Sequence, residues 1–243
     1  MQTTTCKNCK CTINKNFCPN CGQPATLRRI DKHYLIHEIS EFLFANKGMI
    51  YTIKKMLINP GRSTREFIAE DRFRFVKPIT FLFITSLVYS LVNYLFHITA
   101  EDFYQQSDVL EGSTITLIFD WMLIKYPGYS SIITGLFMAF WVKIFFRKSG
   151  YNFFEIFILL CFVSGIQSLF FSGVAIVQGI THWNLMQITI YISIIYLVWS
   201  IGQFFDVKKA ASYIKAFFSY VLGVLALSIV ITIVGTLIDE IIK

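Results

Sequence analysis

Residues 72–97 read RFRFVKPITFLFITSLVYSLVNYLFH, a basic and aromatic stretch that leads into twenty residues without a charged side chain. A helix needs about 20 mainly apolar residues to cross the hydrocarbon core of a bilayer, so this stretch predicts a first membrane span. Hydrophobic residues make up 55% and charged residues 15% of the 243-residue chain, whereas a typical soluble domain has about 25% charged residues. The charged residues concentrate before residue 78, which predicts a polar head followed by a membrane domain.

Four further apolar stretches follow the first one. Lipid offers no water to bond free backbone groups, so each is expected to be a helix. The chain is therefore predicted to be an all-α membrane protein. Its spans are expected at about 79–98, 129–146, 153–177, 184–205 and 216–238. The predicted domains are 1–27, a zinc-ribbon head; 28–77, a basic amphipathic juxtamembrane region; and 78–243, the five-helix transmembrane domain.

The basic residues divide unevenly between the two sides of this arrangement. Of the 22 Lys and Arg residues, 14 lie in the N-terminal arm, three at the junction of spans two and three, and three in the loop between spans four and five. Only Lys125 and Lys243 lie on the other side. Lys and Arg favour the cytoplasmic side. We therefore expect a multi-pass protein of the cytoplasmic (inner) membrane, with its N-terminus inside and its C-terminus outside. The same cations predict contact with the anionic inner leaflet.

Two Cys-x-x-Cys pairs lie near the N-terminus, Cys6 with Cys9 and Cys18 with Cys21. Four thiolates at this spacing can surround one tetrahedral zinc ion, and so short a head would take most of its folding free energy, on the order of 10 kcal/mol, from the metal. We predict a structural zinc ribbon with these four ligands and zinc as its cofactor. Iron with the same ligands stays an alternative, as does a disulfide pair, which a cytoplasmic location disfavours.

The juxtamembrane region carries amphipathic helical patterns. Apolar residues recur on one helical face at Met49, Ile50, Ile53, Met56 and Leu57. The turn at 59–61 ends that helix, and Ser63 and Glu66 have the spacing of a capping box that begins a second one. Contacts with lipid phosphates or a protein partner are expected from Arg65, Arg72, Arg74 and Lys77. Two placements stay open and can hold together: the helices lie on the inner leaflet, or they pack on the cytoplasmic face of the bundle.

A motif runs through this region: a Pro-Gly turn, then Arg-Glu-aromatic-aliphatic, then an Arg-rich stretch that leads through a Pro into the first span. Its residues are Asn59-Pro60-Gly61, Arg65-Glu66-Phe67-Ile68, Arg72-Phe73-Arg74-Phe75, Lys77-Pro78 and Phe81-Leu82. With the ribbon, it resembles a bacterial family of uncharacterised membrane proteins; many members have Gly-Lys where this chain has Glu70-Asp71. The resemblance covers the ribbon and about 30–95, and implies a domain of unknown function. The five-span layout alone is also similar to Yip-type proteins of vesicle traffic.

Polar residues inside the spans are few. One face of the first span carries Ser86, Ser90, Asn93 and His97, and the third span carries Ser164, Ser168 and Ser172. Small hydroxyl residues let helices approach and bond, at about 0.6 kcal/mol each, so ordinary helix packing explains them. The functional alternative is a polar path for a substrate between spans one and three. Because the chain lacks the common catalytic motifs, we predict no catalytic residues.

Three functions are compatible with these features. The first is a non-enzymatic scaffold or adaptor, whose ribbon docks a cytosolic protein while the bundle anchors in lipid or senses it. The second is a small transporter that uses the polar path. The third and least favoured is an intramembrane enzyme in which His97, His182 and Asp120 converge at the outer face. Nucleic-acid binding is not expected, because topology and anionic lipid explain the basic residues more simply, and homo-oligomerisation stays open.

The four-cysteine head generates the first testable prediction. Metal analysis of the purified protein should find about one zinc ion per chain, because four thiolates complete one tetrahedral site. Cys6→Ser or Cys21→Ser should lose that zinc, since each removes a ligand. Full zinc occupancy in both variants would contradict the ligand assignment.

Overall fold

The computed structural model describes residues 4–5, 11–13, 19–20, 47–70, 74–99, 114, 117–118, 122, 125–181 and 183–242. The chain divides into two compact units, Met1–Asn46 and Lys47–Lys243. In the first, strand β1 (Thr4–Thr5) pairs antiparallel with β2 (Thr12–Ile13).

The predicted zinc ligands all lie outside the described residues. They are Cys6, Cys9, Cys18 and Cys21. The structure therefore does not test whether these four thiols meet around one ion, and the zinc ribbon stays a prediction. The sequence predicted only helices, so this small strand pair is an addition. Strand β1 comes just before the first cysteine pair, and β2 lies between the two cysteine pairs in the sequence.

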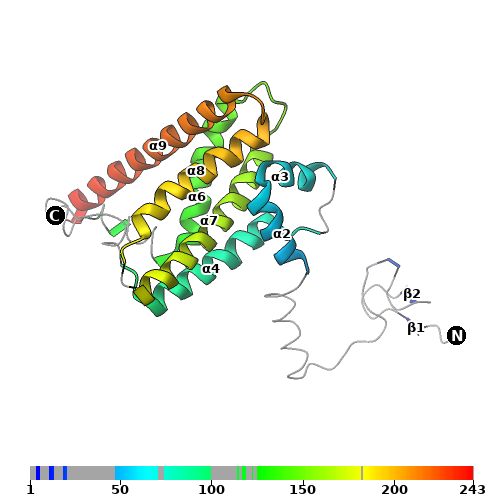
Figure 1. The fold of residues 1–243 in the computed structure, drawn as a ribbon, viewed down its shortest axis with the longest axis horizontal. Helices are drawn as coiled ribbons and strands as arrows, with labels where there is room; N and C mark the ends of the chain where they lie inside the picture. The colour runs from blue at the N-terminus through cyan, green and yellow to red at the C-terminus, as the bar shows by residue number, and fades with distance from the viewer. Residues whose placement is uncertain are drawn as a thin grey trace. The chain divides into compact units, whose positions relative to one another are not determined.

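The regular elements in the described part of the second unit are helices joined by turns (Figure 1). Its helices are α2 (Lys47–Ile58), α3 (Pro60–Ala69), α4 (Pro78–Phe96), α6 (Pro127–Phe145), α7 (Phe153–Thr181), α8 (Met186–Phe205) and α9 (Ala210–Ile242). Proline occupies the first turn of α3, α4 and α6. Its fixed φ suits that position, and its missing N–H removes a donor that would have no partner inside the helix.

Helices α4, α6, α7, α8 and α9 are long and apolar enough to cross a membrane, which agrees with a helical membrane domain of five spans. Helix α7 has 29 residues and α9 has 33. At 1.5 Å per residue they are about 44 and about 50 Å long, against about 30 Å of hydrocarbon. They therefore extend beyond the predicted spans 153–177 and 216–238. Hydropathy locates the lipid-facing part of a helix, whereas backbone hydrogen bonding continues past it.

Helix α7 is the centre of this unit: it contacts α2, α3, α4, α6 and α8, and its interface with α4 is the most extensive. The fully buried ring of Phe162 lies 5.3 Å from Phe67 of α3 and 5.9 Å from Phe81 of α4, measured between ring centroids. These separations are normal for attractive aromatic pairs. Gly165 leaves the space that the Phe81 ring occupies. Aromatic packing thus joins the juxtamembrane hairpin to the spans.

The hairpin of α2 and α3 turns within a single residue, Asn59, which lies between the two helices. The turn agrees with the sequence, but the capping-box prediction is wrong. Helix α3 begins at Pro60, and Ser63 donates from Oγ to the carbonyl of Lys55 (3.1 Å). Glu66 instead pairs with the Lys55 amine (2.9 Å). The helix starts earlier than predicted because proline is already favourable at its first position.

Helix α3 docks across the C-terminal end of α8. The Arg65 guanidinium donates to the carbonyl oxygens of Gln203 (2.7 Å) and Phe204 (2.5 Å). The Gln203 side chain accepts from the Gly61 N–H (2.8 Å) and donates to Asn59 Oδ1 (3.2 Å). The last carbonyls of a helix have no partner within it, so this hairpin supplies donors that α8 needs.

Burial separates two sides of the hairpin. Met56 is fully buried and Phe67 nearly so, and the carbonyl of Met56 accepts from the Tyr196 hydroxyl of α8 (3.0 Å). In contrast, Ile50 is 75% and Ile58 56% exposed. The hairpin therefore packs on the end of the bundle, as one of the two predicted placements has it, and its exposed apolar side is free to meet lipid.

The docking of α3 predicts the effect of Gly61→Ala. A Cβ atom at Gly61 would clash with the Phe204 backbone nitrogen, because the two atoms would lie closer than van der Waals contact allows. Backbone cannot give way as a side chain can, so we expect the free energy of unfolding to fall by about 2 kcal/mol or more. Unfolding of the purified protein by heat or denaturant in a neutral detergent measures this.

Gly173→Ala is the matched control, because a Cβ there has nothing within 4 Å. It should leave stability unchanged or raise it, by up to about 1 kcal/mol from helix propensity. Equal stability of the two alanine variants would contradict a tight α3–α8 junction.

Candidate functional site

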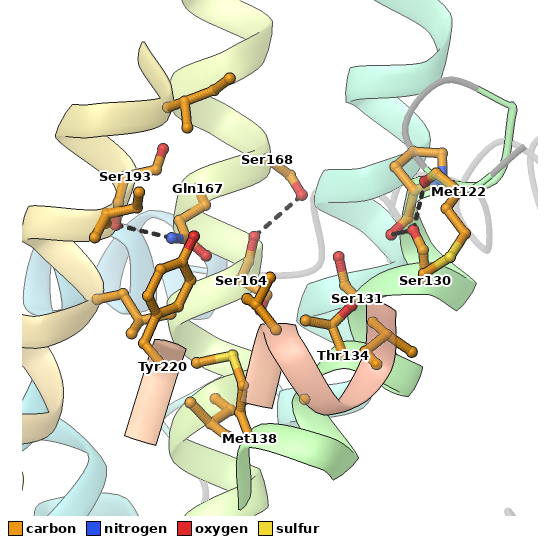
Figure 2. Close-up of a pocket in the computed structure, with 18 of the residues that line it drawn as sticks. Met122, Ser130, Ser131, Thr134, Met138, Ser164, Gln167, Ser168, Ser193 and Tyr220 are labelled. Atoms are coloured by element: carbon orange, nitrogen blue, oxygen red, sulfur yellow. Dashed lines mark hydrogen bonds between the residues drawn. The ribbon is translucent and has the colours of Figure 1, made fainter. Parts of the chain in front are cut away.

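A cavity of about 500 Å³ lies among the membrane-spanning helices, with wall residues from α4, α6, α7, α8 and α9 (Figure 2). Most of the wall is apolar and includes Met138, Leu197 and Ile231. One water molecule needs about 30 Å³, so this volume is far larger than an ordinary packing defect. It falls within the 300–1,000 Å³ that is typical of sites for small molecules.

Hydroxyl groups from all five helices that line the cavity interrupt the apolar wall. They belong to Ser130, Ser131 and Thr134 of α6, Ser164 and Ser168 of α7, Ser193 of α8, and Ser228 of α9, together with Tyr89 and Tyr220. Figure 2 shows the serines and the threonine of α6 and α7 around one space. Some are bonded within their own helix or its neighbouring loop: Ser168 donates to the carbonyl of Ser164 (3.1 Å), and Ser130 to that of Met122 (2.6 Å). Hydroxyls bonded in this way still accept hydrogen bonds.

The hydroxyl of Ser193 differs from its neighbours. Ser193 is only 5% exposed, and its Oγ has no hydrogen-bond partner within the described part of the chain. Its backbone carbonyl accepts from Gln167 Nε2 (3.0 Å), a bond that ties α8 to α7 at the cavity wall. An unsatisfied buried hydroxyl costs about 1–3 kcal/mol. Ser193 is thus a group that an occupant of the cavity could satisfy.

The chemistry of the wall favours an uncharged occupant. Among the described residues that line the cavity there is no Asp, Glu, Lys, Arg or His. A charged molecule would meet no counter-charge at this depth, and its desolvation would go uncompensated. A molecule with an apolar body and one or two hydrogen-bonding groups would match both parts of the wall.

The predicted polar face of the first span does not line this cavity. Ser86 is buried and donates to the carbonyl of Phe83 within α4, Ser90 is half-buried, and exposed His97 ends α4 in a left-handed conformation (φ 51°). Asn93 is 2% exposed, and neither polar atom of its side chain has a partner among the described residues. Tyr89 is the α4 residue that reaches the cavity. Of the predicted stripe on α7, Ser164 and Ser168 line it and Ser172 does not.

Three of the four predicted basic contacts lie at the end of the bundle. Arg65 is half-buried against α8, while Arg74 and Lys77 are exposed. Arg72, His182 and Asp120 lie outside the described residues. Within the part of the chain that the structure describes, no three His, Cys, Asp or Glu side chains are grouped to hold a metal ion. The predicted lipid and partner contacts stay predictions.

The sides of the cavity formed by α6 and α9 were not predicted from the sequence. Ser130, Ser131, Thr134 and Ser228 belong to spans whose hydroxyls were not singled out. The available signal was the presence of hydroxyls on several spans at similar depth, but a sequence does not say which faces turn toward one another. Gln203 was also missed as a docking residue, because its partners Asn59 and Gly61 are more than 140 positions away.

Comparison with known proteins gives a family match over part of the chain. Residues 46–90, which comprise α2, α3 and most of α4, match a family described as "Protein of unknown function (DUF3667)". No curated protein and no solved structure matches the chain. The matched stretch contains the hairpin that docks on α8, and the chain is similar there to an uncharacterised domain family, as the sequence resemblance implied.

Proposed function

We propose that this integral membrane protein is a non-enzymatic adaptor that binds an uncharged lipid in its intramembrane cavity. The observation that carries the proposal is the cavity itself, with its apolar wall, its hydroxyl groups and no charged side chain among its described lining residues. The pairing of an apolar pocket with a few polar groups is the usual form of a small-molecule site.

The depth of the cavity supports a lipid as the occupant. Its lining residues belong mainly to the interior of the spanning helices, such as Leu160 and Gln167 of α7 and Val224 of α9. At that depth a membrane protein is surrounded by acyl chains rather than by water. Helix α9, which forms one wall, has only 22% of its most apolar window buried, against 50% for α7. A lipid is the most abundant molecule beside such a wall.

The hydroxyl groups support a lipid with a hydrogen-bonding group near an apolar chain. Ser193 Oγ offers one unsatisfied donor and acceptor, and the hydroxyls of Ser131 and Thr134 line the same space. In a surrounding of low dielectric constant each such bond is stronger than in water. An ester or hydroxyl of a diacylglycerol-type or isoprenoid-alcohol lipid would supply matching atoms without a charge.

The adaptor part of the proposal rests on the sequence. A closed four-cysteine zinc ribbon has no open coordination position and would be a docking module for a cytosolic protein. The division of the chain at Asn46 is compatible with a separate head. The basic loops support an N-terminus in the cytoplasm and a C-terminus outside.

Transport of a small uncharged solute is the second candidate. Ser164 and Ser168, predicted as one wall of a polar path, do line the cavity. The path was predicted between spans one and three, but these helices, α4 and α7, pack directly against each other. The wall that faces Ser164 and Ser168 comes instead from α6, α8 and α9. Flux of a neutral solute into proteoliposomes, lost when the cavity is filled, would favour this function over lipid binding.

Filling the cavity tests the proposal. The protein should be reconstituted with a neutral diacylglycerol that carries a photoreactive, clickable acyl chain, and the crosslinked peptides mapped by mass spectrometry. Wild-type protein should be labelled at cavity residues of α6, α7 and α9. In Ser228→Phe that labelling should fall severalfold, because the ring would occupy the space of the chain.

Thr232→Phe is the control, since Thr232 lies one turn further along α9, is exposed and does not line the cavity. Labelling of the cavity should persist in this variant. Labelling restricted to the outer, lipid-exposed surface in the wild type, or an equal loss in both variants, would contradict a lipid site in the cavity.

A further inference from the structure

A second hollow, of about 460 Å³, lies at the end of the bundle where α6 and α8 finish and α9 begins. Its wall comes from two loops: the residues after α6, including Arg147 and Lys148, and the residues after α8, including Lys209. These loops are almost 60 positions apart in the sequence, and the fold brings them to one place. The hollow and the cavity between the spans share no lining residue, so substitutions can test the two sites separately.

The wall of the hollow has an excess of positive charge. It contains Arg147, Lys148, Lys209 and Lys215, and only one acidic residue, Asp206. Asp206 pairs with Lys209 (2.9 Å), and this hydrogen bond lowers the pKa of the Asp206 carboxyl. Within the described residues Arg147, Lys148 and Lys215 have no ion-pair partner, which leaves three positive charges uncompensated.

Two stacked aromatic rings line the hollow. Phe146 at the end of α6 and Phe205 at the end of α8 lie 3.8 Å apart, with ring planes 8° from parallel. The Lys215 amine lies 5.8 Å from the centre of the Phe146 ring, which holds this cation at the edge of the hollow. Ala211 and Ser212, in the first turn of α9, complete the wall. The N-terminus of a long helix adds a favourable field for an anion.

Membrane topology explains why these loops contain cations, but not why the cations surround a hollow. Orientation requires only that Lys and Arg lie near the ends of the spans. Several cations and a helix N-terminus around one space are the elements of a phosphate site. We propose that this hollow binds a phosphate group, supplied by the headgroup of an anionic phospholipid in the leaflet at this end of the bundle.

Binding of short-chain lipids to the full-length protein in a neutral detergent tests the proposal. The probes are dioctanoyl phosphatidylglycerol, dioctanoyl phosphatidylcholine and inorganic phosphate, with dissociation constants measured by native mass spectrometry or calorimetry. The phosphatidylglycerol should bind saturably and more tightly than the phosphatidylcholine. The double variant Arg147→Gln with Lys148→Gln should bind it about 25-fold more weakly, at about fivefold for each cation removed.

The control is Lys54→Gln with Arg62→Gln, which removes two exposed cations from α2 and α3, outside the hollow. It should bind like the wild type, and so should the charge-preserving Arg147→Lys with Lys148→Arg. All substituted side chains are exposed, so each variant should keep the wild-type unfolding midpoint.

Competition by inorganic phosphate against the phosphatidylglycerol would support recognition of the phosphate itself. Binding of the lipid without such competition would support the lipid headgroup as the source of the bound phosphate group. Binding of inorganic phosphate alone would overturn the lipid source. Equal weakening by the hollow and control variants, equal affinity for the two lipids, or no binding of any probe would overturn the proposal as a whole.

Discussion

The last carbonyl groups of α8 have no donor within their own helix, and they end inside a protein rather than in open water. In this chain Arg65 donates to two of them, and the side chain of Gln203 bonds both Gly61 and Asn59. These bonds form only when α3 crosses the end of α8, and the lack of a side chain at Gly61 permits that approach. The same hairpin places Phe67 against Phe162 of α7. One junction therefore fixes the hairpin relative to α7 and α8.

The junction divides the helical unit into a tightly packed side and a looser one. The tight side comprises α3, α4, α7 and the end of α8, where buried aromatic rings such as Phe81 and Phe162 interlock. On the other side α9 packs mainly on α6 and α8, and much of its surface is exposed. The cavity and the basic hollow both have α9 as a wall. Both spaces therefore lie on the side of the helical unit where α9 packs.

The spans could be predicted because each is a local property of about 20 residues, and all five predicted spans correspond to apolar helices. The end of α2 could also be predicted, because the local sequence Asn59-Pro60-Gly61 specifies it. The partners of Arg65 and Gln203 could not be predicted, because they lie more than 130 residues apart and no charge or periodicity connects them. The cavity escaped prediction for a related reason. A serine bonded to the carbonyl one turn back, such as Ser168, has the same sequence signal whether it faces lipid, a neighbouring helix or a space.

Helix α3 belongs to the folded bundle through its bonds to the end of α8. Hydrogen–deuterium exchange of the full-length protein in lipid nanodiscs tests it most directly. Peptides from Pro60–Ala69 should exchange as slowly as those from the C-terminal half of α8, and Arg65→Ala should accelerate exchange in both together. Arg62→Ala, exposed on the same helix, should change neither. Rapid exchange of Pro60–Ala69 in the wild type, as expected for an isolated ten-residue helix, would contradict the account.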